Sequence, residues 1–200
     1  MPVLAGALFF ALMAYAGLLL AGRITRSVEP FDDGPQPGEP PLWLLVLGSS
    51  LVGAAVTTHS SGFHLAVVAT VCTCLAAAWY VDARCGIVPD VFSIGPLFLV
   101  LGVAASEHQW GVFVSALIPL APFAAAAALS RGRGMGWGDV KLAALAGAVL
   151  GAQAALLALA VACIAAVLYA STRKQRSAPI AFAPYIAGAI AAAIPLVSVL

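Results

Sequence analysis

Long uncharged runs separated by short polar turns follow one another along the whole chain. Eight such runs are recognised, at residues 1–22, 42–57, 63–81, 91–106, 109–130, 139–150, 153–171 and 179–199. A helix that crosses a bilayer needs about 20 apolar residues, so the pattern predicts eight hydrophobic helical segments. We therefore expect an all-α, polytopic integral membrane protein, with a single membrane-embedded domain over residues 1–200. Residues 1–22 carry no charge and are interpreted as a retained helix, because a signal peptide normally opens with basic residues.

The apolar run 142–172 is too long for one span. As a continuous helix it would extend about 47 Å, whereas the hydrocarbon core is about 30 Å thick. We place a break at Gly151-Ala152-Gln153, which makes the sixth segment short or re-entrant. With this break all nine basic residues fall on one side, at Arg23, Arg26, Arg84, Arg131, Arg133, Lys141, Arg173, Lys174 and Arg176. Basic loops stay in the cytoplasm, so that side is predicted to be cytoplasmic.

Composition narrows the functional classes. Hydrophobic residues make up 63% of the chain and charged residues 8%, against about 25% charged residues in an ordinary soluble domain. No basic stripe with interleaved aromatic residues is present, so we expect no nucleic-acid partner. The four cysteines form no C-x-x-C pair, and neither a metal site nor a disulfide framework is predicted.

Most of the eight acidic residues have an ordinary explanation. Glu29, Asp32, Asp33 and Glu39 lie in the polar loop 23–41 and are interpreted as solvated. Glu107 ends an apolar run on the side opposite to the basic residues. Asp82, Asp90 and Asp139 remain, each at a junction between an apolar run and a polar turn.

These three aspartates differ in their local context. Asp90 follows Pro89 and precedes an apolar run, which favours an N-cap role. Asp139 could cap a helix in the same way, but Gly136 and Gly138 precede it, and capping does not require them. Glycine allows the close approach of another chain, such as a substrate strand. Asp82 is predicted to end a helix, where negative charge is disfavoured; neutralisation by Arg84 is the alternative to a functional role.

A pair of carboxylates can activate water. Two acids held close together share one proton, because both cannot cheaply be charged. The ionised acid would take a proton from water, and the neutral acid would donate to the carbonyl oxygen under attack. We expect Asp82 to hold the proton and Asp139, near a helix start, to ionise more readily.

At these residues the chain resembles the prepilin peptidases, which are GxGD aspartyl proteases of type IV pilus and related secretion systems. The family pattern is an aspartate, six residues and Pro-Asp, here Asp82 to Pro89-Asp90, followed by G-x-G-D-x-K-L, here residues 136–142. A third likeness is I-A-F-A-P-Y at residues 180–185, which includes Pro184; the family has Pro and Gly where this chain has Ala181 and Ala183. The likeness covers residues 42–200, the expected peptidase core.

The resemblance implies a site and a reaction. The catalytic residues carried over are Asp82 and Asp139, with Gly136, Gly138, Asp90, Lys141 and Pro184 as substrate-binding or structural support. It implies cleavage of the basic leader of a prepilin-like protein at the cytoplasmic membrane face, with water and without metal or cofactor. Snorkelling of Lys141 to the interface explains that residue as well as catalysis does.

One departure from the family concerns the first loop. Full-length members carry a large cysteine-containing cytoplasmic domain that methylates the product, whereas residues 23–41 are a short loop without cysteine. We therefore expect no N-methyltransferase activity. The acids of this loop could accompany the basic leader, although a solvated loop explains them too.

Other functions remain open at this stage. Acids within a membrane often mark ion paths, which would make the chain an ion-coupled transporter, but no acid is placed to relay a proton across the bilayer. A non-catalytic subunit of a pilus or secretion assembly is another alternative, since small-residue helices pack well against partners. A GxGD protease that cuts within substrate helices is disfavoured by the spacing between Asp82 and Pro89-Asp90.

Overall fold

The computed structural model describes residues 2–27, 41–57, 62–130, 135–172 and 181–197. In these ranges the chain forms eight α-helices and one short 3₁₀ helix. They are α1 (Pro2–Ser27), α2 (Leu42–Val56), α3 (Gly62–Cys85), α4 (Asp90–Ser106), α5 (Gly111–Leu129), α6 (Trp137–Leu150), α7 (Ala152–Thr172), α8 (Ala183–Ala193) and η1 (Ile194–Leu196). The prediction of an all-α protein with eight helical segments is confirmed.

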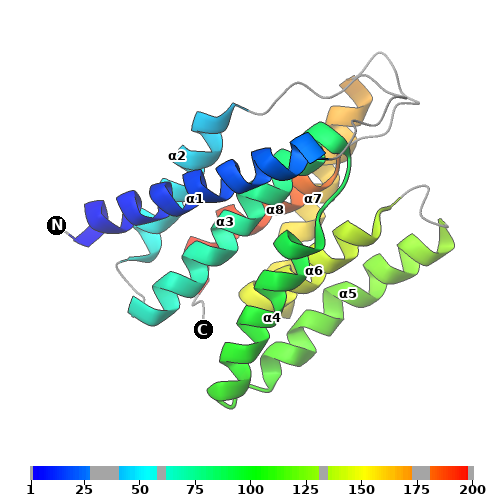
Figure 1. Cartoon of the computed structure of the whole chain (residues 1–200). Coiled ribbons are helices and arrows are strands. Elements are labelled where there is room, and N and C mark those ends of the chain that lie inside the picture. The colour runs from blue at the N-terminus through cyan, green and yellow to red at the C-terminus, as the bar shows by residue number, and fades with distance from the viewer. Residues whose placement is uncertain (1, 28–40, 58–61, 131–134, 173–180, 198–200) are drawn as a thin grey trace.

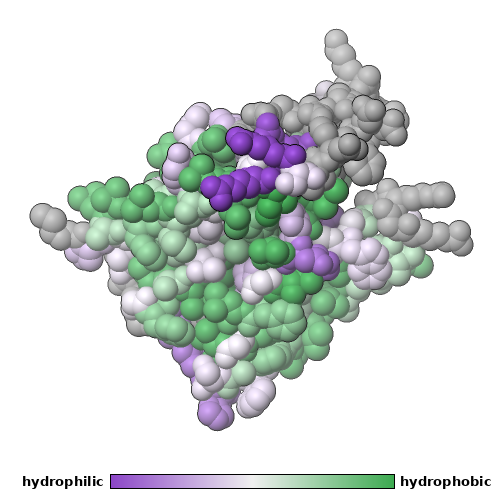
Figure 2. Space-filling view, viewed as in Figure 1, coloured by the Kyte–Doolittle hydropathy of each residue, from purple (hydrophilic) through white to green (hydrophobic). Residues whose placement is uncertain are grey.

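Four of these helices are long and apolar enough to cross a membrane, namely α1, α3, α5 and α7. Helices α2 and α4, and α8 together with η1, are apolar but shorter. Hydrophobic residues cover most of the face seen in Figure 2, and hydrophilic residues gather mainly toward its upper end. An exposed apolar surface of this kind requires lipid, so the chain is a polytopic membrane protein.

The helices run up and down, so that successive connections lie at alternate ends of the bundle. In Figure 1, α1, α3 and α7 end toward the upper right and α5 ends at the right, whereas α2 begins at the upper centre and runs back toward the lower left. Helices α4 and α8 each pack against both α3 and α6. The ends of α3 and the starts of α4, α6 and α8 therefore meet in one region.

Helix α6 forms the centre of the larger apolar core. Every residue from Leu142 to Leu150 is buried, and Ile186, Ile190 and Ile194 of α8 and η1 are fully buried in the same cluster. A helix that is apolar on all sides belongs in the interior of a bundle. Burial on all sides explains how so short a helix is stabilised at the centre of the bundle.

Glycine ends two helices where the chain must turn. Gly151, between α6 and α7, has a φ of +76°, and Gly86, just after α3, has a φ of +65°. Residues with a side chain rarely adopt such angles. The predicted break of the run 142–172 at Gly151 is confirmed.

Two predicted helix boundaries are wrong. Helix α1 continues through Arg23 and Arg26 to Ser27, because long basic side chains are good helix formers and can extend from a helix end toward water. Helix α3 continues to Cys85, so Asp82 lies within its last turn rather than after it. The described part of α8 begins at Ala183; the predicted start at residue 179 lies outside the described residues, as do most of the first loop and Arg131, Arg133, Arg173, Lys174 and Arg176.

Candidate active site

Asp82 is a buried acid near the end of α3. Its side chain is 6% exposed, and its Oδ2 accepts a hydrogen bond of 3.1 Å from the backbone N–H of Ala183. The backbone carbonyl of Asp82 accepts a hydrogen bond of 2.8 Å from Gly86, which closes the end of the helix. The carboxylate is therefore held by the start of α8, a segment far away in the sequence.

Asp139 is the second buried acid and is the third residue of α6. Its side chain is 8% exposed, and its Oδ2 accepts a hydrogen bond of 3.2 Å from the backbone N–H of Gly136. This is half of a capping box, in which the third helical residue reaches back to the N-cap; Gly136 has no side chain to complete it. Burial raises the pKa of the Asp139 carboxyl, and the Gly136 N–H opposes this rise by favouring the charged form.

The two acids lie in the same region of the bundle. Gly138, next to Asp139, packs against Val88 in the turn after α3, and Lys141 of α6 pairs with Asp90 just after that turn. Within the described ranges the two acids are the only charged side chains that are buried. Burying an acid is costly unless it is paired or performs a function, so two such acids at one place indicate a functional site.

The predicted glycines have different structural roles. A Cβ atom on Gly138 would lie 2.7 Å from Cβ of Val88, so this glycine allows the start of α6 to approach the turn between α3 and α4. A Cβ atom on Gly136 would be 3.5 Å from Asp139 Oδ2, an ordinary contact. The close approach at Gly138 is thus to the chain itself; docking of a substrate strand stays a prediction.

Asp90 is not the N-cap that its sequence context predicts. Pro89 occupies the N-cap position of α4, and the side chain of Asp90, the first helical residue, makes no capping hydrogen bond. Instead, its Oδ1 forms an ion pair with Nζ of Lys141 on α6. Lys141 is half-buried. Its ammonium links the G-x-G-D motif to the Pro89-Asp90 motif, a role that is compatible with snorkelling.

The third motif contributes a backbone donor. Pro184 is the second residue of α8, where a missing N–H costs no helical hydrogen bond. Ala183, just before it, donates to Asp82. The sequence reading missed this role of Ala183, since a backbone amide has no residue signature; only the likeness at 180–185 pointed to the segment.

Arg84 makes a local contact with Tyr80, one turn earlier in α3. Its guanidinium lies over the Tyr80 ring at 5.2 Å from the centroid and donates to the ring hydroxyl. A cation over an aromatic face is a favourable arrangement, and it orients Arg84 along the helix.

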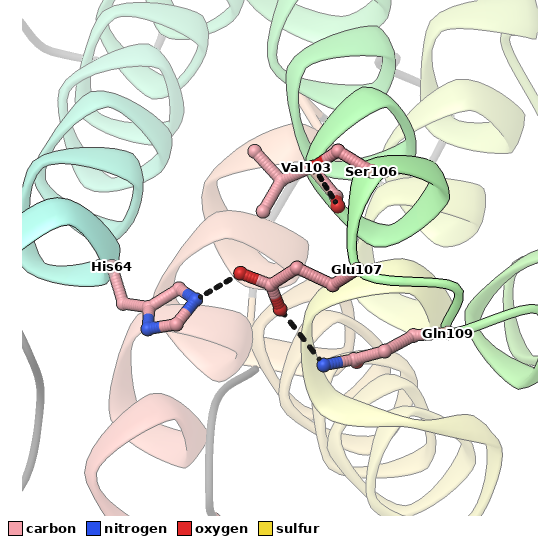
Figure 3. A network of polar contacts seen from close by, with 5 residues as sticks. All are labelled: His64, Val103, Ser106, Glu107 and Gln109. Carbon is pink, nitrogen blue, oxygen red and sulfur yellow. Dashed lines mark hydrogen bonds and ion pairs between the residues drawn. The ribbon is translucent and has the colours of Figure 1, made fainter.

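A separate polar network lies at the opposite end of α3. Nε2 of His64 is 2.8 Å from Oε1 of Glu107, and Gln109 donates to Oε2 of Glu107 at 2.9 Å (Figure 3). From the sequence, Glu107 is expected only to end an apolar run on that side. His64 and Glu107 join the start of α3 to the end of α4, far along the helices from Asp82.

No metal-binding group is evident in the part of the chain that the structure describes. Its His, Cys, Asp and Glu residues do not gather in any set of three that could hold an ion. The four cysteines, all described, are free thiols. The chemistry that the described site itself offers is that of two carboxyl groups and backbone amides.

These features define an all-α membrane protein with two buried acids where α3, α4, α6 and α8 meet. A family model described as the Type IV leader peptidase family matches residues 69–171, about half of the chain. The chain therefore belongs to this family and is a type IV leader peptidase-like protease. The match includes Asp82 and Asp139 and ends before α8. No curated protein matches the chain, and no solved structure does.

Proposed function

We propose that this protein is an aspartyl endopeptidase that removes the leader peptide of prepilin-like proteins, with Asp82 and Asp139 activating the attacking water. One observation carries the proposal: Asp82 of α3 and Asp139 of α6 are buried where the start of α6 packs against the turn after α3, with Gly138 directly against Val88. Structural acids of a membrane bundle would be expected to pair with cations instead. Membership of a leader peptidase family supplies the reaction class.

The reaction needs one proton shared between the two acids. The ionised carboxylate removes a proton from water as the water oxygen attacks the scissile carbonyl carbon, and the neutral carboxyl donates its proton to the carbonyl oxygen. The tetrahedral intermediate then collapses: the acid that took the water proton gives it to the leaving nitrogen as the C–N bond breaks, and the other acid takes a proton back from a hydroxyl of the intermediate. Each acid can play either part in this scheme.

Other motif residues support this pair in the proposal. Gly138 lets Asp139 approach the turn after Asp82, Gly136 donates to Asp139, and the Asp90–Lys141 ion pair ties α4 to α6. Pro184 lies beside the amide that holds Asp82. None of these groups needs to touch the substrate for this role.

The proposed location is the cytoplasmic face of the inner or plasma membrane. Arg23, Arg26, Arg84 and Lys141 all lie at the end of the bundle that holds the two acids, and positive charge favours the cytoplasmic side. A prepilin-like leader is basic and would present its cleavage site there. Water has access to this face, as hydrolysis requires.

The test is cleavage of prepilin-like proteins from the same genome, co-expressed with this chain. We expect the mobility shift of the substrate to be lost with Asp82→Asn or Asp139→Asn, with kcat/KM lower by about 10²–10⁴-fold. Glu107→Gln makes the same chemical change at the other end of α4 and should leave cleavage intact. Full cleavage by both aspartate variants would refute the proposed mechanism, and binding of prepilins without cleavage by the intact protein would favour a non-catalytic assembly subunit.

A further inference from the structure

The hydrogen bond from Ala183 to Asp82 depends on how the start of α8 is held. Ala183 is fully buried and is the first residue of the helix. The carbonyl of Phe182 accepts hydrogen bonds from the N–H groups of Tyr185 and Ile186, at 3.0 and 3.3 Å. These two hydrogen bonds close the turn and fix the Ala183 amide relative to the Phe182 and Tyr185 rings.

Two aromatic contacts fix this turn to neighbouring helices. The ring of Phe182 stacks on Phe123 of α5, with centroids 6.5 Å apart and an interplanar angle of 18°. The ring of Tyr185 contacts Tyr169 of α7, with centroids 6.0 Å apart. Aromatic pairs in this distance range attract each other beyond simple burial. The turn is thus held from two sides, one ring on each side of Ala183 in the sequence.

We propose that Phe182 and Tyr185 are positioning residues, which hold the Ala183 amide so that it orients the Asp82 carboxylate toward Asp139. This inference rests on the proposed function of the two aspartates. Aspartate has a freely rotating terminal torsion, so a single fixed donor on Oδ2 decides which way the carboxylate plane faces. A displacement of about 1 Å in a catalytic group can cost on the order of 10²-fold in rate.

The decisive variants are Phe182→Ala and Phe123→Ala, which remove the two sides of one stacked pair. We expect each to lower kcat by about 10- to 100-fold with KM nearly unchanged, because the reacting group rather than the bound substrate is displaced. Phe182→Tyr keeps the ring and should restore kcat. The double variant should be no slower than either single variant, since both act through the same contact. Phe98→Ala removes an exposed phenylalanine of α4 (69% exposed) and is the matched control.

A second measurement does not use activity. Hydrogen exchange of the segment 181–186 should be faster in Phe182→Ala than in the intact protein, and unchanged in Phe98→Ala. Unchanged kcat in Phe182→Ala and Phe123→Ala, with Asp82→Asn inactive, would overturn this inference and leave the proposed function standing. A loss of kcat that Phe182→Tyr does not restore and that follows a loss of Tm would also overturn it. Full activity of both Asp82→Asn and Asp139→Asn would refute the proposed function itself.

Discussion

Each of the two buried acids keeps one backbone N–H as a partner, and the two donors come from different parts of the chain. Gly136 serves Asp139 from within the same motif, whereas Ala183 serves Asp82 from a position 101 residues away. A hydrogen bond to a charged group contributes about 1.5–3 kcal/mol, which offsets only part of the cost of burying a carboxylate. The site is therefore maintained against an energetic cost, as is typical of functional residues.

Gly138 offers the sharpest single-residue test of how the site is packed. A methyl group there would collide with Val88, so Gly138→Ala should push the start of α6 and Asp139 away from the turn after Asp82. We expect a loss of about 1–3 kcal/mol in stability and a kcat lower by about 10- to 100-fold. Leader cleavage and Tm in detergent measure the two effects.

The matched control for this change lies in α4. Gly95 has open space around its Cα, so Gly95→Ala should leave both cleavage and Tm close to those of the intact protein. An equally small effect of Gly138→Ala would show that the contact with Val88 is not needed.

At the scale of helices, small residues allow the central helix α6 to approach its neighbours. A Cβ atom on Gly147 would lie 2.2 Å from the backbone carbonyl oxygen of Ser115 and 2.9 Å from Cα of Ala116. Backbones that approach this closely without a side chain between them gain van der Waals contact, which is a main source of helix association in membranes. Gly147 therefore allows the backbones of α5 and α6 to pack closely against each other.

Gly147→Ala should separate α5 from α6, because backbone atoms cannot yield as a flexible side chain can. We expect a loss of about 1–3 kcal/mol, read as a lower Tm in detergent. Gly102→Ala, in α4, meets nothing within 4 Å and should be neutral. Equal melting temperatures of the two variants would contradict the close packing of α5 on α6.

The Asp90–Lys141 ion pair also acts at this scale, between α4 and α6. The Asp90 side chain is 64% exposed and that of Lys141 31%, and exposed pairs contribute about 0–1 kcal/mol. Its contribution to stability is thus small. The pair joins the start of α4 to the start of α6, so we expect it to affect the relative orientation of these two helices more than the stability of the protein.

At the scale of the whole molecule, the up-and-down order of the helices predicts which ends share a side of the membrane. The ends of α1 and α7 lie together and opposite to the end of α4. With the end that holds the two acids in the cytoplasm, as proposed, Ser27→Cys and Ser171→Cys should be labelled by an impermeant maleimide in inverted vesicles, and Ser106→Cys in right-side-out vesicles. All three serines are exposed, and the four native cysteines are replaced beforehand. Labelling of Ser106→Cys and Ser27→Cys from the same side would contradict the topology.

Much of the fold follows from the sequence by itself. The number and approximate bounds of the helices, the break at Gly151 and the places of Asp82 and Asp139 beside polar turns depend on local features. Hydrophobic length is read from successive residues, and a glycine with positive φ is a common way to end a helix abruptly. The sequence motifs pointed to the two acids without any knowledge of the tertiary structure.

The partners of these residues were decided only by the tertiary structure. Asp90 pairs with Lys141 across 51 residues rather than capping its own helix, Gly138 meets Val88, and the Ala183 amide reaches Asp82 across 101 residues. Such contacts depend on how the helices cross one another, which side-chain packing throughout the bundle determines. Local hydrophobicity decides that a segment is a helix and where it ends, but contacts between distant segments decide what its acids meet.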